Sequence, residues 1–328
     1  MSLNVEYLRY EIKPRYEENF PLDWRKFFGR EGELFVEIGF GNGEFLVEMA
    51  KRYPEKNFIG FELSITSMVK VQKKIHDLKL KNVRVIMEDG RFALREFFED
   101  ESIETVVTNF PCPWPKKAHK ERRITSGDFL DTLSVVLKPK GVFELVTDER
   151  WYAEEVYEKL LKNGCFDVGS ILENPERPVE TRYERKWKSQ GKKIFLIRAY
   201  KKKKGNVEKL LKGGIDLPHV LFQGDVKDED VFSLEGKVFK KGDKVFVVKN
   251  TFKGEDSFLL KVISTDKDFQ QQYFLILLKK KNGWLLKLDS ASNPYRTPAV
   301  KWSVRKLAEI LSSEESSVSN HTVHHVDD

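Results

Sequence analysis

The chain has 328 residues, of which 40% are hydrophobic and 34% charged, and its formal net charge of +6 favours an anionic partner. No apolar run is long enough to cross a bilayer, and the segment Met1 to Tyr16 lacks the hydrophobic stretch of a signal peptide, so we expect no membrane-inserted or secreted protein. The two cysteines, Cys112 and Cys165, form neither a disulfide framework nor a metal-ligand spacing, which fits a reducing cytoplasm.

Strands and helices alternate through the first part of the chain. Apolar runs predict strands at 34–38, 57–61, 83–87, 103–107, 142–146 and 194–200. Helical periodicity predicts helices at 44–51, 92–98, 129–137 and 153–161, and another that Ser64 caps, with Ile65, Met68, Val69 and Ile75 among its apolar positions. A turn is expected at 139–141. This alternation predicts a doubly wound, mostly parallel α/β sheet.

A lysine-rich break at 201–206 changes the composition, and we place a domain boundary there. β-type runs follow at 245–248, 257–265, 273–279 and 284–288, and a short helix is predicted at 304–311. We therefore expect a first domain at 1–201, a linker at 202–216 and a smaller β-rich domain at 217–311. Residues 312–328, rich in Ser, Glu and His, are expected to form a disordered tail rather than a metal site.

Three glycines, Gly39, Gly41 and Gly43, follow the first predicted strand and allow a tight turn into the next helix. The dinucleotide-binding fingerprint has its third glycine one position later, where this chain has Glu44. Glu37, at the end of the strand, repels a pyrophosphate but suits a cationic ligand. The loop resembles that of the Rossmann-like methyltransferases, whose cofactor, S-adenosylmethionine, carries an ammonium and a sulfonium.

Two more acidic residues come at the ends of the next two predicted strands. Glu62 can accept both hydroxyls of a ribose, and Asp89 can accept from the amino group of an adenine. Each acid alone is more often an ordinary surface carboxylate. Three acids at consecutive strand ends, beside a glycine turn, favour a cofactor site.

The segment 108–123 leaves the fourth predicted strand as a stiff loop that then becomes strongly basic. Pro111, Pro113 and Pro115 are incompatible with a helix or a ladder strand, and loops at the carboxyl ends of such strands are where ligands bind. One interpretation is that this aromatic loop clamps a flat ring while the basic run holds a polyanion. The alternative is a Pro-rich surface turn followed by solvated charges.

With these motifs the chain resembles the bacterial tRNA (guanine-N7)-methyltransferases of the TrmB type. The resemblance spans about residues 19–200 and rests on 37–43, 61–62, Asp89, 109–123, 147–148, 181–184 and 191–192. It implies a Rossmann-like class I methyltransferase fold, S-adenosylmethionine as cofactor, and methylation of the variable-loop guanine, nucleotide 46, of tRNA. The cofactor-binding residues that it implies are Glu37, Gly39, Gly41, Gly43, Glu62, Asp89 and Asn109. The substrate-binding residues that it implies are Trp114, Lys116, Lys117, His119, Arg122, Arg123, Asp148, Thr181 and Glu184.

The chain departs from this family at Cys112, where the usual residue is an Asp that is regarded as catalytic or guanine-binding. The N7 lone pair of guanine carries no proton, so its attack on a methyl group needs orientation and a negative field rather than a general base. Besides the Cys112 position, we name Asp148 and Glu184 as catalytic candidates. Their carboxylates can supply that field and accept from N1 and N2 of the base.

Basic residues flank the predicted pocket in two segments, which are 116–123 and 182–193. Phosphate neutralisation close to the chemistry is what an RNA substrate needs. Trp114 either stacks on a displaced base or packs under the loop, and His119 either contacts RNA or caps the next helix. The β-rich domain either contacts tRNA, stabilises the protein or forms a dimer contact.

Three functions remain open from the sequence. The first is a cytoplasmic tRNA (guanine-N7)-methyltransferase, monomeric or homodimeric, with tRNA as its partner, no metal and no obligatory protein partner. The second is a methyltransferase that uses the same cofactor on another substrate. The third is a non-catalytic RNA-binding protein whose site is degenerate at Cys112. Methyl transfer to unmodified tRNA separates the first function from the others.

Overall fold

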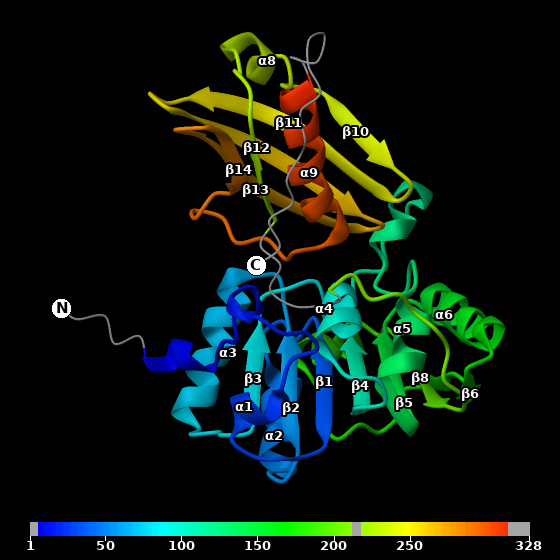
Figure 1. The fold of residues 1–328 in the computed structure, drawn as a ribbon. Coiled ribbons are helices and arrows are strands. Elements are labelled where there is room, and N and C mark those ends of the chain that lie inside the picture. Colours follow the sequence, from blue (N-terminus) through cyan, green and yellow to red (C-terminus); the bar gives the residue numbers. More distant parts are fainter. Residues whose placement is uncertain (1–5, 212–217, 314–328) are drawn as a thin grey trace. The chain divides into compact units, whose positions relative to one another are not determined.

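The computed structural model describes residues 6–211 and 218–313 (Figure 1). The chain divides into two compact units, Met1–Lys209 and Leu210–Asp328, so the division comes eight residues after the predicted end of the first domain at 201. Residues 212–216 of the predicted linker, residue 217 of the predicted β-rich domain and residues 314–328 of the predicted tail, with all three tail histidines, lie outside the described residues. No helix in the described ranges is long and apolar enough to cross a membrane.

An eight-stranded sheet forms the centre of the first unit, in the order β3-β2-β1-β4-β5-β8-β6, with β7 paired to β8. Strands β1 to β5 pair with one another in parallel, whereas β8 is antiparallel to β5, β6 and β7. The bounds are β1 Leu34–Ile38, β2 Asn57–Phe61, β3 Val83–Ile86, β4 Ile103–Asn109, β5 Leu137–Thr147, β6 Phe166–Val168, β7 Leu172–Glu173 and β8 Phe195–Lys201. The predicted doubly wound, mostly parallel sheet is confirmed.

The strand order reverses at β1. The chain moves outward from β1 to β2 and β3, and then returns to place β4 on the other side of β1. In open α/β sheets a reversal of this kind leaves a crevice beyond the carboxyl ends of the two central strands. The glycine loop after β1 and the proline-rich loop after β4 therefore border the same crevice.

Helices connect these strands, with bounds α1 Trp24–Phe28, α2 Glu44–Arg52, α3 Ile65–Asp77, α4 Gly90–Phe97, α5 Phe129–Val136, α6 Arg150–Asn163 and α7 Arg182–Ser189. Short 3-10 helices are η1 Glu6–Tyr10, η2 Pro14–Tyr16 and η3 Lys117–Arg122. Ser64 caps α3 as predicted, because its Oγ accepts from the Ser67 amide at 3.3 Å. The predicted apolar face of α3 is partly wrong: Ile65 and Val69 are 68% and 39% exposed, and Val71 is buried instead.

Strand β5 begins five residues before the predicted strand, so it contains the predicted turn at 139–141. Its pairing with β4 shifts register between Ile103 and Thr105, and Lys140 has a φ of 65°. The turn residues therefore form an irregularity within the strand and do not separate it from α5.

The second unit is a six-stranded antiparallel sheet in the order β10-β11-β12-β13-β14-β9. Its bounds are β9 His219–Phe222, β10 Val238–Lys241, β11 Lys244–Lys253, β12 Ser257–Asp266, β13 Phe269–Lys280 and β14 Gly283–Leu288, with helices α8 Asp228–Phe232 and α9 Pro298–Ser313. Helix α9 packs on one face of the sheet through Val300, Val304 and Leu307. The predicted β-rich character is confirmed, whereas α9 is longer than the predicted helix and takes in Ser312 and Ser313 of the predicted tail.

Candidate active site

Two adjoining cavities, of about 260 and 350 Å³, lie at the carboxyl ends of β1 and β4. The residues that line both cavities are Gly39, Glu62, Asn109, Phe110 and Cys112. The smaller cavity continues to Glu37, Gly41, Thr181 and Tyr183, and the larger one to Leu63, Asp89, Arg91 and Trp114. The structure therefore brings the glycine loop, the strand-end acids and the proline-rich loop together, as their positions in the sequence predicted.

The glycine loop turns sharply because its three glycines have positive φ angles of 72°, 54° and 69°. A Cβ atom on Gly43 would lie 2.2 Å from Cγ2 of Val71, so this position has room only for glycine. At Gly41 a Cβ would meet only the edge of the Tyr183 ring, at 4.0 Å. Gly43 thus permits close packing of α2 on α3, whereas Gly41 leaves backbone accessible from the cavity.

Backbone amides hold the Glu62 carboxylate in place. Oε2 accepts from the Gly41 amide at 2.9 Å, and Oε1 accepts from the amides of Leu63 and Ser64 at 2.8 and 3.1 Å. A carboxylate has about four lone-pair positions, so a further donor can still bind. The half-buried side chain borders both cavities, where a ribose hydroxyl could donate to it.

Glu37 is buried in β1, with 1% of its surface exposed. Its Oε1 accepts from Nδ2 of Asn109 at 2.8 Å, whereas its Oε2 is buried and has no hydrogen-bond partner among the described residues. Burial raises the pKa of Glu37 to about 7, because the charged form loses its hydration. A cationic ligand in the smaller cavity would neutralise this carboxylate and supply the missing donor, so the site fits an ammonium group.

Asp89 lies in the wall of the larger cavity and caps α4. Its Oδ1 accepts from the Arg91 amide at 2.8 Å, and its Oδ2 forms an ion pair with Nη2 of Arg91 at 3.1 Å. The predicted contact with adenine stays a prediction, since this carboxylate already has local donors.

The proline-rich loop is fixed by Arg123, which the sequence placed among the phosphate-binding residues. Arg123 is 4% exposed, donates from Nη2 to the Trp114 carbonyl and from Nε to the Pro113 carbonyl, both at 3.0 Å, and forms an ion pair with Glu155. This placement differs from the surface position that a phosphate contact needs. Arg123 therefore stabilises the loop from the buried side.

The other basic residues of this segment are on the surface. Lys116, Lys117 and Arg122 are exposed, and the Arg122 guanidinium lies 5.1 Å from the centre of the Trp114 ring. The His119 ring packs edge-on against the Trp114 ring, with 5.6 Å between the ring centres. Trp114 is half-buried between these two side chains, and Cys112 is exposed in the wall of both cavities.

Two of the three catalytic candidates are not in the cavity walls. Neither Asp148 nor Glu184 is among the residues that line the two cavities. Asp148 forms an ion pair with Lys192. Glu184 is 1% exposed, and its two carboxyl oxygens contact Nη1 of Arg177 at 2.7 Å and Nζ of Lys188 at 3.1 Å. A contact between Glu184 and guanine would require one of these ion pairs to open.

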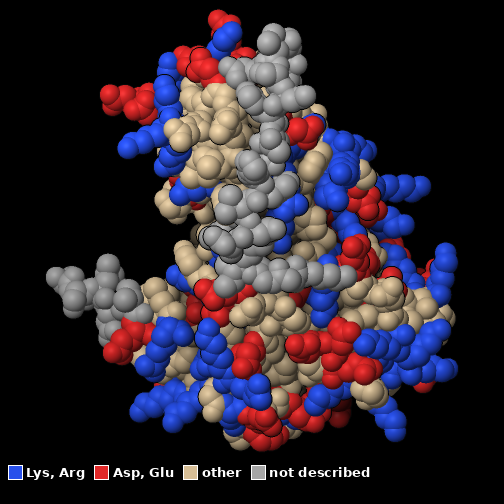
Figure 2. Space-filling model, viewed as in Figure 1, with Lys and Arg blue, Asp and Glu red and all other residues tan. Residues whose placement is uncertain are grey.

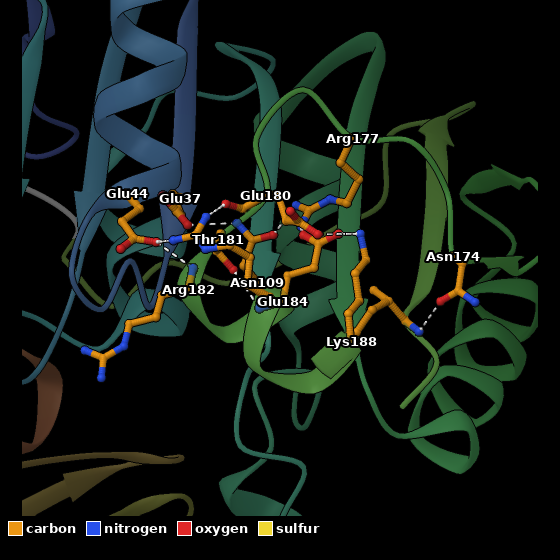
Figure 3. A network of polar contacts seen from close by, with 12 residues as sticks. Glu37, Glu44, Asn109, Asn174, Arg177, Glu180, Thr181, Arg182, Glu184 and Lys188 are labelled. Atoms are coloured by element: carbon orange, nitrogen blue, oxygen red, sulfur yellow. Dashed lines mark hydrogen bonds and ion pairs between the residues drawn. The ribbon is translucent and has the colours of Figure 1, made fainter. Parts of the chain in front are cut away.

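A polar network joins the glycine loop to α7 (Figure 3). Thr181 caps α7 by accepting from the Glu184 amide at 3.2 Å, and Glu44 of α2 accepts from the Arg182 amide at 2.6 Å. Arg177, which sequence reasoning missed, donates to Oδ1 of Asn109 and to Glu184. It lies between two prolines in an irregular segment, so no periodicity or spacing in the sequence marks it.

The chain is similar to known methyltransferases. Residues 31–197 match the family described as putative methyltransferase. The chain is 56% identical over 308 residues to a tRNA (guanine-N(7)-)-methyltransferase of Thermotoga maritima, in a match that covers 94% of this chain and 98% of that protein. It is 30% identical over 312 residues to a protein of the same name from Thermus thermophilus, covering 95% and 99%. A solved structure described as an antibiotic related methyltransferase is 17% identical, with a TM-score of 0.42, and covers 62% of this chain and 99% of its own.

Proposed function

The chain belongs to the family of tRNA (guanine-N7)-methyltransferases, and we propose that its target is the variable-loop guanine, nucleotide 46, of tRNA. It is a methyltransferase that uses S-adenosylmethionine to methylate N7 of a guanine in tRNA. The observation that carries the assignment of the cofactor pocket is the buried Glu37, whose Oε2 lacks a partner among the described residues at the base of the smaller cavity.

Residues around the two cavities support a site for the amino-acid and ribose parts of the cofactor. Glu37 would receive the ammonium, the backbone at Gly39 and Gly41 allows close approach, and Glu62 would accept from the ribose. S-adenosylmethionine, when bound, supplies a methyl group on a positively charged sulfur. The residues of the glycine loop and of the proline-rich loop that line the two cavities would hold that group.

The task of the chain toward guanine is orientation. N7 attacks with a lone pair that carries no proton, so no residue has to remove one. Cys112, at the junction of the two cavities, lies where the family has an acid, so the chain lacks that carboxylate there. We therefore infer that catalysis in this chain rests on placement of the base more than on a carboxylate beside it.

Exposed basic residues near the cavities are the proposed tRNA contacts. Lys116, Lys117 and Arg122 come from η3 and its approach, and Arg182, Arg185 and Lys186 come from α7. Figure 2 shows Lys and Arg interspersed with Asp and Glu over the first unit, so no patch of one sign marks an RNA site on that face. The position of these cations beside the cavity supports the proposal.

The test of the proposed target uses two tRNA transcripts that differ at one nucleotide. The chain should transfer one methyl group to the transcript with guanine at position 46. A matched transcript with adenine at that position should accept none, although it should compete for binding with nearly equal affinity. Equal transfer to both transcripts would show that the methylated nucleotide is not at position 46. It would not contradict the guanine-N7 activity itself.

A further inference from the structure

We propose that Arg177 is a positioning residue for the cofactor, which turns the Asn109 amide toward Glu37 and keeps Glu37 in the charged form that binds the ammonium. The inference rests on the proposed cofactor pocket and assigns a role to a residue outside the sequence motifs. Arg177 does not line either cavity. It acts through Asn109 and Glu37, which line the smaller one.

Arg177 is held on three sides. Its side chain is 2% exposed, its Nη1 contacts Oε2 of Glu184 at 2.7 Å, and its Nη2 donates to Oδ1 of Asn109. Its guanidinium lies 5.2 Å from the centre of the Phe45 ring, in the helix that follows the glycine loop. A planar group with fixed donors can hold such an arrangement, whereas an ammonium on a flexible stem cannot reproduce it.

The contact with Arg177 fixes which way the Asn109 amide points. An asparagine amide has an accepting oxygen and a donating nitrogen on opposite sides. Because Arg177 can only donate, Oδ1 must face it, and Nδ2 then faces Oε1 of Glu37 at 2.8 Å (Figure 3). Without Arg177 the amide is free to turn over, which would set its oxygen against the Glu37 carboxylate.

The Arg177 charge also favours the ionised form of Glu37. The pKa of Glu37 is raised to about 7, because burial and the nearby Glu62 raise it by more than the Asn109 hydrogen bond, the Arg177 charge and the Leu46 amide lower it. Glu184 in turn neutralises the Arg177 guanidinium, so a positive ligand at Glu37 does not meet an uncompensated cation. Removing Arg177 should therefore raise the pKa of Glu37 further.

This arrangement predicts a pH signature in cofactor binding. Only ionised Glu37 attracts an ammonium, so affinity falls as pH drops through the pKa of Glu37 in the free protein. If Arg177→Met raises that pKa, the variant loses affinity near neutral pH and regains it once the pH exceeds the new value. The loss approaches about tenfold for each unit by which the pKa rises.

The experiment measures the Kd of S-adenosylhomocysteine by calorimetry between pH 6 and pH 9. This ligand keeps the ammonium but cannot donate a methyl group, and the ratio of variant to wild-type Kd cancels the titration of its own amino group. For Arg177→Met a rise of one unit in the pKa of Glu37 gives a ratio of about five near pH 7, which approaches ten near pH 6 and one near pH 9. Arg177→Lys retains the charge but not the fixed planar donors, so only part of the affinity should return.

A matched control is Arg198→Met, which removes a half-exposed arginine that pairs with Glu144 on the same sheet and does not line the cavities. Its Kd ratio should stay near one at every pH. In a Glu37→Gln background, adding Arg177→Met should produce no pH-dependent change. If Arg177→Met does not fold, Arg177→Gln removes the same charge and is measured instead.

A Kd ratio that is the same at all pH values, or a ratio of one throughout, overturns the proposal. The first result would make Arg177 a purely structural residue. Failure of the wild-type chain to bind the ligand at all would instead contradict the proposed cofactor pocket, so the two failures are distinguishable.

Discussion

Glu37 shows how burial prepares a binding group at the scale of one residue. Its Oε2 is buried and has no hydrogen-bond partner among the described residues, so the carboxylate bears a desolvation cost in the free protein. A ligand cation removes that cost when it binds. The same chemistry explains why a carboxylate is found where a pyrophosphate-binding protein has none.

Glu62 gives the first prediction at this scale. Glu62→Ala removes a charged acceptor for the ribose and also releases the Gly41 amide, so S-adenosylmethionine affinity should fall by about 1.5–3 kcal/mol. Calorimetry measures this directly. Glu48→Ala, on the outer side of α2 and paired with Lys51, is the matched control and should leave affinity unchanged. Unchanged affinity in Glu62→Ala would remove Glu62 from the site.

Cys112 gives the second prediction at the scale of one residue. Because N7 needs no general base, the chain should be active as it is, and Cys112→Asp should raise the transfer rate modestly without changing cofactor affinity. Cys112→Asn has the shape of Asp without its charge and separates the two effects. A wild-type rate equal to background, restored by orders of magnitude in Cys112→Asp, would show that the carboxylate is indispensable.

At the scale of an element, the conformation of the proline-rich loop depends on Arg123, the last residue of the basic segment 116–123. Arg123→Ala removes the donors to the Pro113 and Trp114 carbonyls and the partner of Glu155, and we expect it to lower stability by about 2–3 kcal/mol and to slow transfer. The salt dependence of tRNA binding should not change, because a buried guanidinium touches no phosphate.

Lys117→Ala is the contrasting change in the same segment. Lys117 is exposed, so its loss should leave the melting temperature nearly unchanged while lowering the slope of log affinity against log salt by about one unit. If Arg123→Ala lowers the slope and Lys117→Ala does not, the assignment of the two residues is reversed.

The elements differ in how far the sequence could predict them. The first five strands, the glycine turn and the acids at strand ends follow from apolar runs and turn residues, which act locally. Arg122 and Arg123 are indistinguishable in the sequence, yet one lies over Trp114 and the other beneath the loop. Arg177 was missed because its partner Asn109 is 68 positions away and its segment has no regular period. Strands β9 and β10, of four residues each, were not predicted.

At the scale of the whole molecule, the second unit has a face that carries positive charge. By strand register, Lys240, Lys261 and Lys287 lie on the side of the sheet opposite α9, and none of them forms an ion pair within the described part of the chain. Such a face suits a polyanion. We therefore expect the second unit to add to tRNA binding, which the sequence left open.

Ending the chain after Lys209 tests this expectation. The first unit keeps the whole cofactor pocket, so its affinity for S-adenosylhomocysteine should be unchanged. Its KM for tRNA should rise and its salt slope should flatten. In the full chain, Lys261→Glu with Lys287→Glu should act in the same direction, whereas Lys306→Glu on α9 should not. A lower melting temperature with unchanged KM would make the second unit a stabilising appendage.

The most direct measurement is the identity of the nucleoside that the full chain produces. Unmodified tRNA is incubated with the chain and S-adenosylmethionine, digested, and analysed by chromatography and mass spectrometry. We predict 7-methylguanosine as the methylated nucleoside, in no more than one copy per tRNA, and none when the cofactor is left out. A methyl group on another atom or base, or no methylated nucleoside while the chain binds both cofactor and tRNA, would contradict the assignment of a guanine-N7 methyltransferase.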